Sequence, residues 1–292
     1  MGSDILILTV YGLVVFYVLY QMAISIENEL EDRLKIQLDV RTLLQQVKNQ
    51  LKQQPYEDRI RATIEKPKVK SLAKIGPQLN LLVQRAENPK QRARVTVAVR
   101  PVGVMPLGRK LNSLQVIVVN ESPDAQIYVD WDRSTITADL FTQRVVRQGP
   151  VLGNDLTRPQ VFSVVNPGEL LTMDITGEGC LSPTADTTQV EISTPIVDMN
   201  TVAMGAPPIN AMDEEAMAAE PPAYSLNLML GIRRITESES YTTYLLLPFG
   251  FQAFLLPDEI AFPPLRWLLN APRPAKASDW WETLILGKTS KR

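Results

Sequence analysis

The first apolar stretch of the chain, Ile5–Ile26, contains no charged side chain. An α-helix rises about 1.5 Å per residue, so this stretch would extend about 33 Å, enough to cross a hydrocarbon core of roughly 30 Å. A cleaved signal peptide is the alternative, but it requires a basic n-region, and Met1–Asp4 has no Lys or Arg. We predict a transmembrane anchor over residues 1–26, in which Tyr17 and Tyr20 contribute to docking.

A helical pattern follows the anchor over residues 27–54. Apolar side chains recur at three- and four-residue spacings, with polar side chains between them, at Ile26, Leu30, Leu34, Leu38, Val40, Leu44, Val47 and Leu51. Pro55 ends the pattern, because proline clashes with the preceding helical turn. The predicted amphipathic helix either packs on its own domain or forms a short coiled coil between copies of the chain, which would make a homo-oligomer.

From Val95 the apolar pattern changes to a period of two and β-branched residues become frequent. The predicted strands, separated by Gly, Pro and Asn clusters, are 95–99, 114–119, 127–131, 144–146, 170–175, 189–193, 224–235 and 243–256. This pattern predicts a mainly β protein with an antiparallel β-sandwich domain over residues 95–256. Within it, residues 195–222 are rich in Met, Ala and Pro and lack a period, which indicates a loop or a disordered insertion.

Charge is unevenly distributed along the chain. Residues 59–110 contain 13 basic and 2 acidic side chains, a net charge of +11, whereas the whole chain carries −2. We expect residues 55–94 to form a basic connecting segment that attracts anionic lipid headgroups through Arg59, Arg61, Lys66, Lys68, Lys70 and Lys74. An acidic partner or an ordinary solvated surface are the alternatives. Nucleic acid is not an expected partner, because residues 59–110 contain no aromatic side chain for base stacking.

The C-terminal residues 257–292 form a tail rich in proline and tryptophan. Its prolines interrupt regular structure, and residues 278–286 have the pattern of a short capped helix. Adjacent tryptophans cannot both point into a small core, and tryptophan suits half-wet surfaces. We predict a docking tail whose contact residues are Trp267, Trp280, Trp281, Leu284 and Ile285.

Reactive side chains are scarce. The chain contains no histidine, which argues against His-based catalytic triads and most zinc sites, and it has one cysteine, Cys180, without a basic neighbour to activate its thiol. Asp130, Asp132 and Asp139 could bind Ca²⁺, or Asp132 could cap a turn at an exposed strand end. We expect no enzymatic activity, no cofactor and no metal ion.

Residues 120–176 carry a recognisable pattern: a strand with an Asp-Trp-Asp triplet, a second strand and a Pro-Gly turn. The matching residues are Tyr128, Asp130, Trp131, Asp132, Ser134, Ile136, Thr137, Arg144, Val145, Val146, Pro167, Gly168 and Leu171. The pattern resembles uncharacterised membrane-anchored bacterial proteins of cyanobacterial type that contain an immunoglobulin-like β-sandwich domain. The resemblance covers about a fifth of the chain. It implies an immunoglobulin-like fold and a thylakoid or plasma membrane, and it implies no catalysis.

Together these features predict a single-pass membrane protein that acts as an accessory, scaffold or assembly subunit. Its partners would be the lipid bilayer and a larger membrane protein complex, photosynthetic or respiratory by the analogy above. The alternative is a membrane-tethered binding module for a small ligand, a metal ion or anionic lipid headgroups. Lys and Arg residues follow the anchor and none precedes it, which predicts that the large domain is cytoplasmic.

Overall fold

A computed structural model describes most of the chain between residues 33 and 256. The described residues are 9–15, 17–19, 33–54, 59–65, 76–85, 90–106, 109–138, 140–148, 159–183, 190–209, 220–238 and 241–256. The chain divides into one unit made of Met1–Asp32 and Asp258–Arg292 and a second unit, Arg33–Pro257. In the first unit, residues 9–15 and 17–19 are helical. No helix among the described residues combines the length and apolar character needed to cross a membrane.

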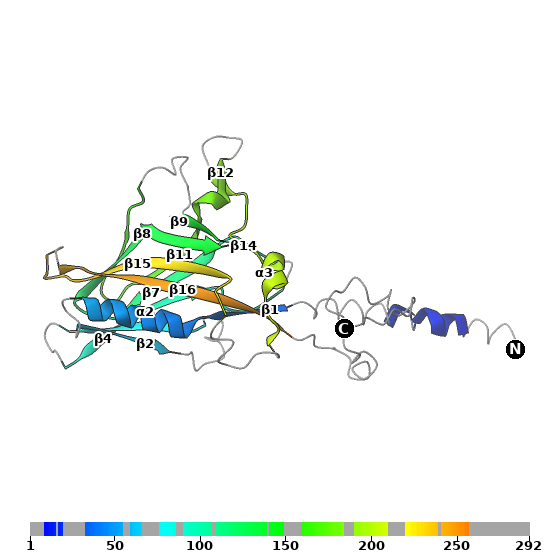
Figure 1. The fold of residues 1–292 in the computed structure, drawn as a ribbon, viewed down its shortest axis with the longest axis horizontal. Helices are drawn as coiled ribbons and strands as arrows, with labels where there is room; N and C mark the ends of the chain where they lie inside the picture. Colours follow the sequence, from blue (N-terminus) through cyan, green and yellow to red (C-terminus); the bar gives the residue numbers. More distant parts are fainter. Residues whose placement is uncertain are drawn as a thin grey trace. The chain divides into compact units, whose positions relative to one another are not determined.

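The second unit is mainly β, as predicted, and its described residues form a 12-stranded antiparallel sheet (Figure 1). Along the sheet the strands follow the order β2-β3-β4-β7-β11-β9-β8-β15-β16-β1-β5, and β10 also pairs with β8. The strands are β1 (Arg33–Leu38), β2 (Ile60–Glu65), β3 (Gln78–Gln84), β4 (Arg92–Arg100), β5 (Gly103–Pro106), β7 (Leu114–Asn120), β8 (Ala125–Ala138), β9 (Phe141–Arg147), β10 (Ser163–Val165), β11 (Leu170–Gly177), β15 (Tyr224–Arg234) and β16 (Thr243–Leu255).

The smaller elements of this unit lie between the long strands. Two short strand pairs join β12 (Leu181–Pro183) to β13 (Val190–Ile192) and β14 (Val197–Asp198) to β6 (Lys110–Leu111). The helices are α2 (Val40–Gln53), α3 (Met199–Gly205) and the 3₁₀ turn η3 (Glu178–Cys180).

Strand β9 folds the sheet into two layers. Its first residues, 141–144, pair with β8, and its last residues, 145–147, pair with β11. A strand that changes partner in this way makes a corner between packed layers. One layer therefore contains β2, β3, β4, β7 and β11, and the other contains β8, β15, β16, β1 and β5. The sandwich-like arrangement is one continuous curled sheet, whereas the sequence had indicated a pair of separate sheets.

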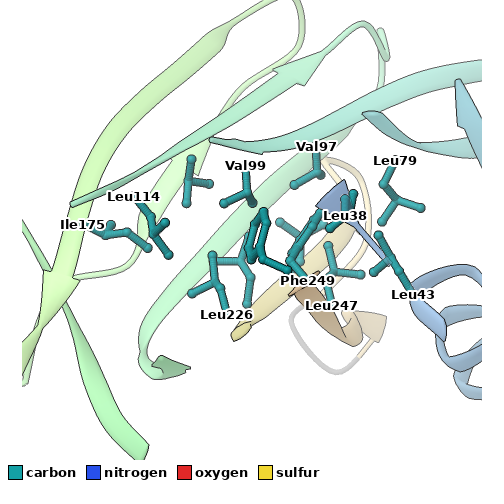
Figure 2. Packing of buried hydrophobic residues seen from close by; sticks show 14 of the residues in the cluster. Leu38, Leu43, Leu79, Val97, Val99, Leu114, Ile175, Leu226, Leu247 and Phe249 are labelled. Carbon is teal, nitrogen blue, oxygen red and sulfur yellow. The ribbon is translucent and has the colours of Figure 1, made fainter. Parts of the chain in front are cut away.

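Alternating burial along the strands explains how the two layers hold together. In β8 every second residue from Ala125 to Trp131 is buried, because successive side chains of a strand point to opposite faces. Figure 2 shows side chains of the two layers directed toward one another, Val97 and Val99 from one and Leu226 and Phe249 from the other. All four belong to one continuous hydrophobic core cluster, whose burial from water stabilises the fold.

Helix α2 covers the side of the core opposite β9, where it contacts both β16 and β2 (Figure 1). The Asp39 carboxylate accepts a hydrogen bond from the Thr42 backbone N–H at 3.0 Å and so caps the first turn. Leu43, Val47 and Leu51 lie on the buried face. The side-chain amide of Gln50 bonds the backbone N–H and C=O of a β16 residue, at 2.8 and 2.7 Å, so that the helix occupies a free strand edge.

The prediction of a helix over residues 27–54 is wrong at its start. Residues 33–38 form β1, in which Leu34, Ile36 and Leu38 are buried at alternate positions. Leu34 and Leu38 are four residues apart and fit either period, but buried Ile36 between them fits only a strand. The helix begins after its cap at Asp39, and residues 27–32 lie outside the described residues.

Two further segments expected to be irregular contain regular structure. The basic segment 55–94 contains β2, β3 and the beginning of β4. In β2 the buried Ile60 and Ala62 alternate with exposed polar residues, which is the pattern of a strand. The insertion 195–222 contains β14 and the capped helix α3, while residues 210–219 lie outside the described part of the chain. The eight strands predicted from Val95 onward all occur.

Candidate docking surface

The part of the chain that forms the sheet begins and finishes at the same end of the sheet. Ala138 of β8 pairs with Tyr224 of β15, which in turn pairs with Phe251 of β16. Beyond this row β16 continues alongside β1 until Leu34 faces Leu255. The chain therefore enters the sheet at the start of β1 and leaves it at the end of β16, side by side. We call this the β1 end of the sheet.

Large apolar side chains are exposed at the β1 end. Leu140 and Phe141, at the turn between β8 and β9, are 98% and 71% exposed. Val104 of β5 faces Lys35 of β1 and is 56% exposed. Met204 of α3 is 89% exposed, and α3 leads to the segment that bonds the last residue of β16. We call Val104, Leu140, Phe141 and Met204 the apolar rim.

Leu140 also has an unfavourable backbone conformation. Its φ is +68°, in the left-handed region, where the Cβ of a leucine crowds the backbone and glycine or asparagine is preferred. Its exposed side chain makes no compensating contribution to the core. Strain that packing does not explain is a reason to examine a turn for function.

An ionic network fixes the strands behind this turn. Arg144 of β9 donates to Asp132 of β8 at 3.1 Å and to Glu178 at 3.1 Å. Asp132 also accepts from the backbone N–H of Gln160 at 2.7 Å, and the Gln160 amide donates to the Val145 carbonyl at 2.6 Å. These carboxylates are engaged by a guanidinium and amide groups, so the network is suited to holding β8 and β9 in register.

The Asp-Trp-Asp region builds a bulge in β8. Between Asn227 and Met229 of β15 the register shifts, and the Ser134 hydroxyl accepts from the Met229 backbone N–H at 3.0 Å. Asp130 accepts from the backbone N–H of Arg133 at 3.2 Å. Asp130 and Asp132 share a face and Trp131 lies buried on the other, as the alternation predicted. These residues bend the strand and support the packed layers.

Two other chemically distinctive groups are buried. The Cys180 thiol lies within 3.7 Å of the Gln143 side-chain oxygen and is 2% exposed, consistent with a packing role. Tyr224 stacks on Phe251 with ring centroids 4.8 Å apart. Burial raises the pKa of Tyr224, and its hydroxyl has no hydrogen-bond partner among the described residues. This tyrosine therefore stays protonated.

The predicted docking and lipid-binding residues are only partly described. Tyr17 lies in the helical residues 17–19 and is 62% exposed. Arg59 forms an ion pair with Glu237 at 3.0 Å, and Arg61 is exposed on β2. The other residues lie outside the described part of the chain: Tyr20, Lys66, Lys68, Lys70, Lys74, Trp267, Trp280, Trp281, Leu284 and Ile285.

The apolar rim was not predicted. The one available signal was the pair Leu140-Phe141 directly after Asp139, between two predicted strands, where turn residues are usually polar.

Among the described residues, no group of three or more His, Cys, Asp or Glu side chains could hold a metal ion. Comparisons with protein-family models, curated proteins and solved structures found no match.

Proposed function

We propose that this protein is a non-catalytic, membrane-anchored accessory subunit that docks on a larger membrane protein complex. The observation that carries the proposal is the pairing of Leu34 with Leu255. The apolar segment 1–26 precedes β1, and the tryptophan-rich tail 257–292 follows β16. An anchor and a docking tail that leave the sheet at the same end can engage one membrane and one partner together.

The basic segment supports a membrane-facing β1 end. Strand β4 ends at Arg100 and leads directly to β5, which pairs with β1. Leu79 of β3 pairs with Val97 of β4, so β3 begins, and β2 ends, at this same end. The segment between them contains the four lysines assigned to lipid headgroups. Arg59, by contrast, precedes β2 at the opposite end of the sheet and is paired with an acid.

The proposed site of action is the cytoplasmic side of a thylakoid or plasma membrane. The orientation follows from the Lys and Arg residues after the apolar segment. The membrane type follows only from the resemblance of residues 120–176 to membrane-anchored immunoglobulin-like proteins. The immunoglobulin-like fold that this resemblance implies stays a prediction. The chain contains no histidine, which supports a non-catalytic role for the protein. Arg144 forms ion pairs with both Asp132 and Glu178, which supports a structural role for these two carboxylates.

Purification in mild detergent tests the proposal. Full-length protein, extracted from its native membranes, should co-purify with membrane proteins in a stable complex. Replacing Trp280 and Trp281 with Ala should reduce the yield of that complex. Tyr244→Ala, at a residue 48% exposed on β16, is the matched control and should leave the yield unchanged. Recovery of a lone monomer, with no co-purifying protein, would contradict the proposal.

A further inference from the structure

We infer that the apolar rim, Val104, Leu140, Phe141 and Met204, rests in the headgroup region of the lipid bilayer and forms a second membrane contact. This inference rests on the proposed membrane anchoring, because it requires the β1 end to lie near the bilayer. The inference assigns a function to an exposed surface of the sheet, one that the anchor does not itself require. The rim would hold the domain in a fixed orientation on the membrane.

The length of the connecting chain keeps the rim close to the bilayer. Seven residue steps separate Ile26, the end of the apolar segment, from Arg33 at the start of β1. A fully extended chain covers at most about 3.6 Å per residue, so this link reaches about 25 Å. The turn at Leu140 lies at the same end of the sheet as Arg33. A tether of this length allows the β1 end to lie against the membrane surface or just above it.

The chemistry of the rim suits a lipid interface. Leu140 and Phe141 protrude from a turn, where leucine and phenylalanine can enter the boundary between headgroups and acyl chains to a shallow depth. Arg109 and Lys110, both exposed, lie beside α3: the Arg109 carbonyl accepts from Met199, and Lys110 pairs with Asp198. Basic side chains next to apolar ones are attracted to anionic headgroups.

The rim residues also come from three separate elements. Leu140 lies in the β8–β9 turn with Phe141 at the first position of β9, Val104 lies in β5 and Met204 in α3. Separate apolar side chains spread around one end of a domain match a fluid interface, which needs no shape complementarity. A specific protein interface buries a contiguous, well-packed patch instead. The left-handed backbone of Leu140 keeps an apolar side chain at a position where asparagine or glycine would fit better.

A fluorescent probe at the rim tests the inference. Full-length protein with Cys180→Ala and Leu140→Cys is labelled with an environment-sensitive dye and reconstituted into phosphatidylcholine vesicles with and without phosphatidylglycerol. Lys52→Cys in the same background is the matched control, because Lys52 is exposed near the C-terminal end of α2, away from the β1 end. We expect blue-shifted emission and quenching by nitroxide-labelled lipids at position 140 and neither effect at position 52. Met204→Cys provides a second site on the rim.

The other outcomes separate the rim from the anchor. If the protein stays with the vesicles after alkaline washing but the probe at 140 remains in water, the inference is overturned and the proposed anchoring stands. If the probe is shielded only in native membranes and not in pure lipid, the rim binds a protein, which also overturns it. If the protein is released by alkaline washing, both proposals fail.

Discussion

Replacement of Leu140 by asparagine should make the protein more stable and its membrane contact weaker. Leu140 holds a left-handed backbone at φ +68° while its side chain is 98% exposed. Replacing it with asparagine removes an apolar group that contributes no core packing and supplies a residue that tolerates this conformation. Leu140→Ala is the matched control, because alanine also removes the apolar bulk but lacks the side-chain amide that lets asparagine hydrogen-bond locally and tolerate the left-handed conformation.

The magnitude follows from the backbone alone. The left-handed conformation costs an ordinary L-residue about 1–2 kcal/mol, and asparagine recovers part of that, about 0.5–1 kcal/mol. For a domain of roughly 200 residues, 1 kcal/mol shifts the Tm by about 2–4 °C. We expect Leu140→Asn to raise the Tm by about 1–4 °C and Leu140→Ala to leave it within about 1 °C, since no buried contact is lost.

Thermal unfolding in detergent micelles, followed by near-UV circular dichroism, measures the stability difference. In vesicles, the same two variants should weaken the rim contact equally, because each removes the leucine side chain. This weakening can be followed as the loss of nitroxide quenching of a label at Met204→Cys. Equal Tm values for the asparagine and alanine variants would refute the argument from backbone strain. A higher Tm for alanine than for asparagine would refute it too.

Three further substitutions test polar side chains that bear on the stability of the fold. Tyr224→Phe should raise stability by about 1 kcal/mol, because it removes a buried hydroxyl without a described partner. Because burial raises the folded pKa of Tyr224, the natural protein should also lose stability as the pH rises above about 10, and the variant should lose less over the same range. Asn120→Asp should destabilise the fold by about 2–4 kcal/mol at pH 7, because a carboxylate cannot donate to the two backbone carbonyl groups that the amide bonds at 2.8 and 3.0 Å. Urea unfolding should show a smaller loss of stability at pH 4, because burial raises the pKa of the introduced carboxyl and keeps it protonated there. Gln50→Ala should cost about 1–2 kcal/mol in the same assay by freeing the β16 edge from α2, and an unchanged midpoint would contradict that role.

The strands from Val95 onward could be predicted because their burial alternates with a period of two. In β8 the buried and partly exposed residues alternate from Ala125 to Trp131, and the sequence AQIYVDW shows the same alternation. Strand β1 was missed because Leu34 and Leu38 satisfy a helical and a strand period equally. Its pairing with β16, more than 200 residues later, decides between them, and no local pattern reports a partner so distant.

The candidate site was less predictable than the fold. Exposure of Leu140 depends on where the β8–β9 turn stands in the folded sheet, and a leucine in a sequence is normally assigned to a core. Charge counting over residues 59–110 treated all basic side chains alike. In the structure Arg94 pairs with Glu121 at 2.9 Å, and Arg59 pairs with an acid that is distant in sequence. Net charge along a chain therefore overstates the basic surface left for lipids.

The layout of the sheet limits how a partner could bind. Two segments of the chain leave at the β1 end, and the apolar rim surrounds the same end. A partner that binds the C-terminal tail close to where it leaves β16 would contact the domain at this end, where we propose the membrane lies. The opposite end carries the Arg59–Glu237 pair, and α2, which begins near the β1 end, runs towards it. A membrane protein complex at the β1 end can contact the domain and the bilayer together.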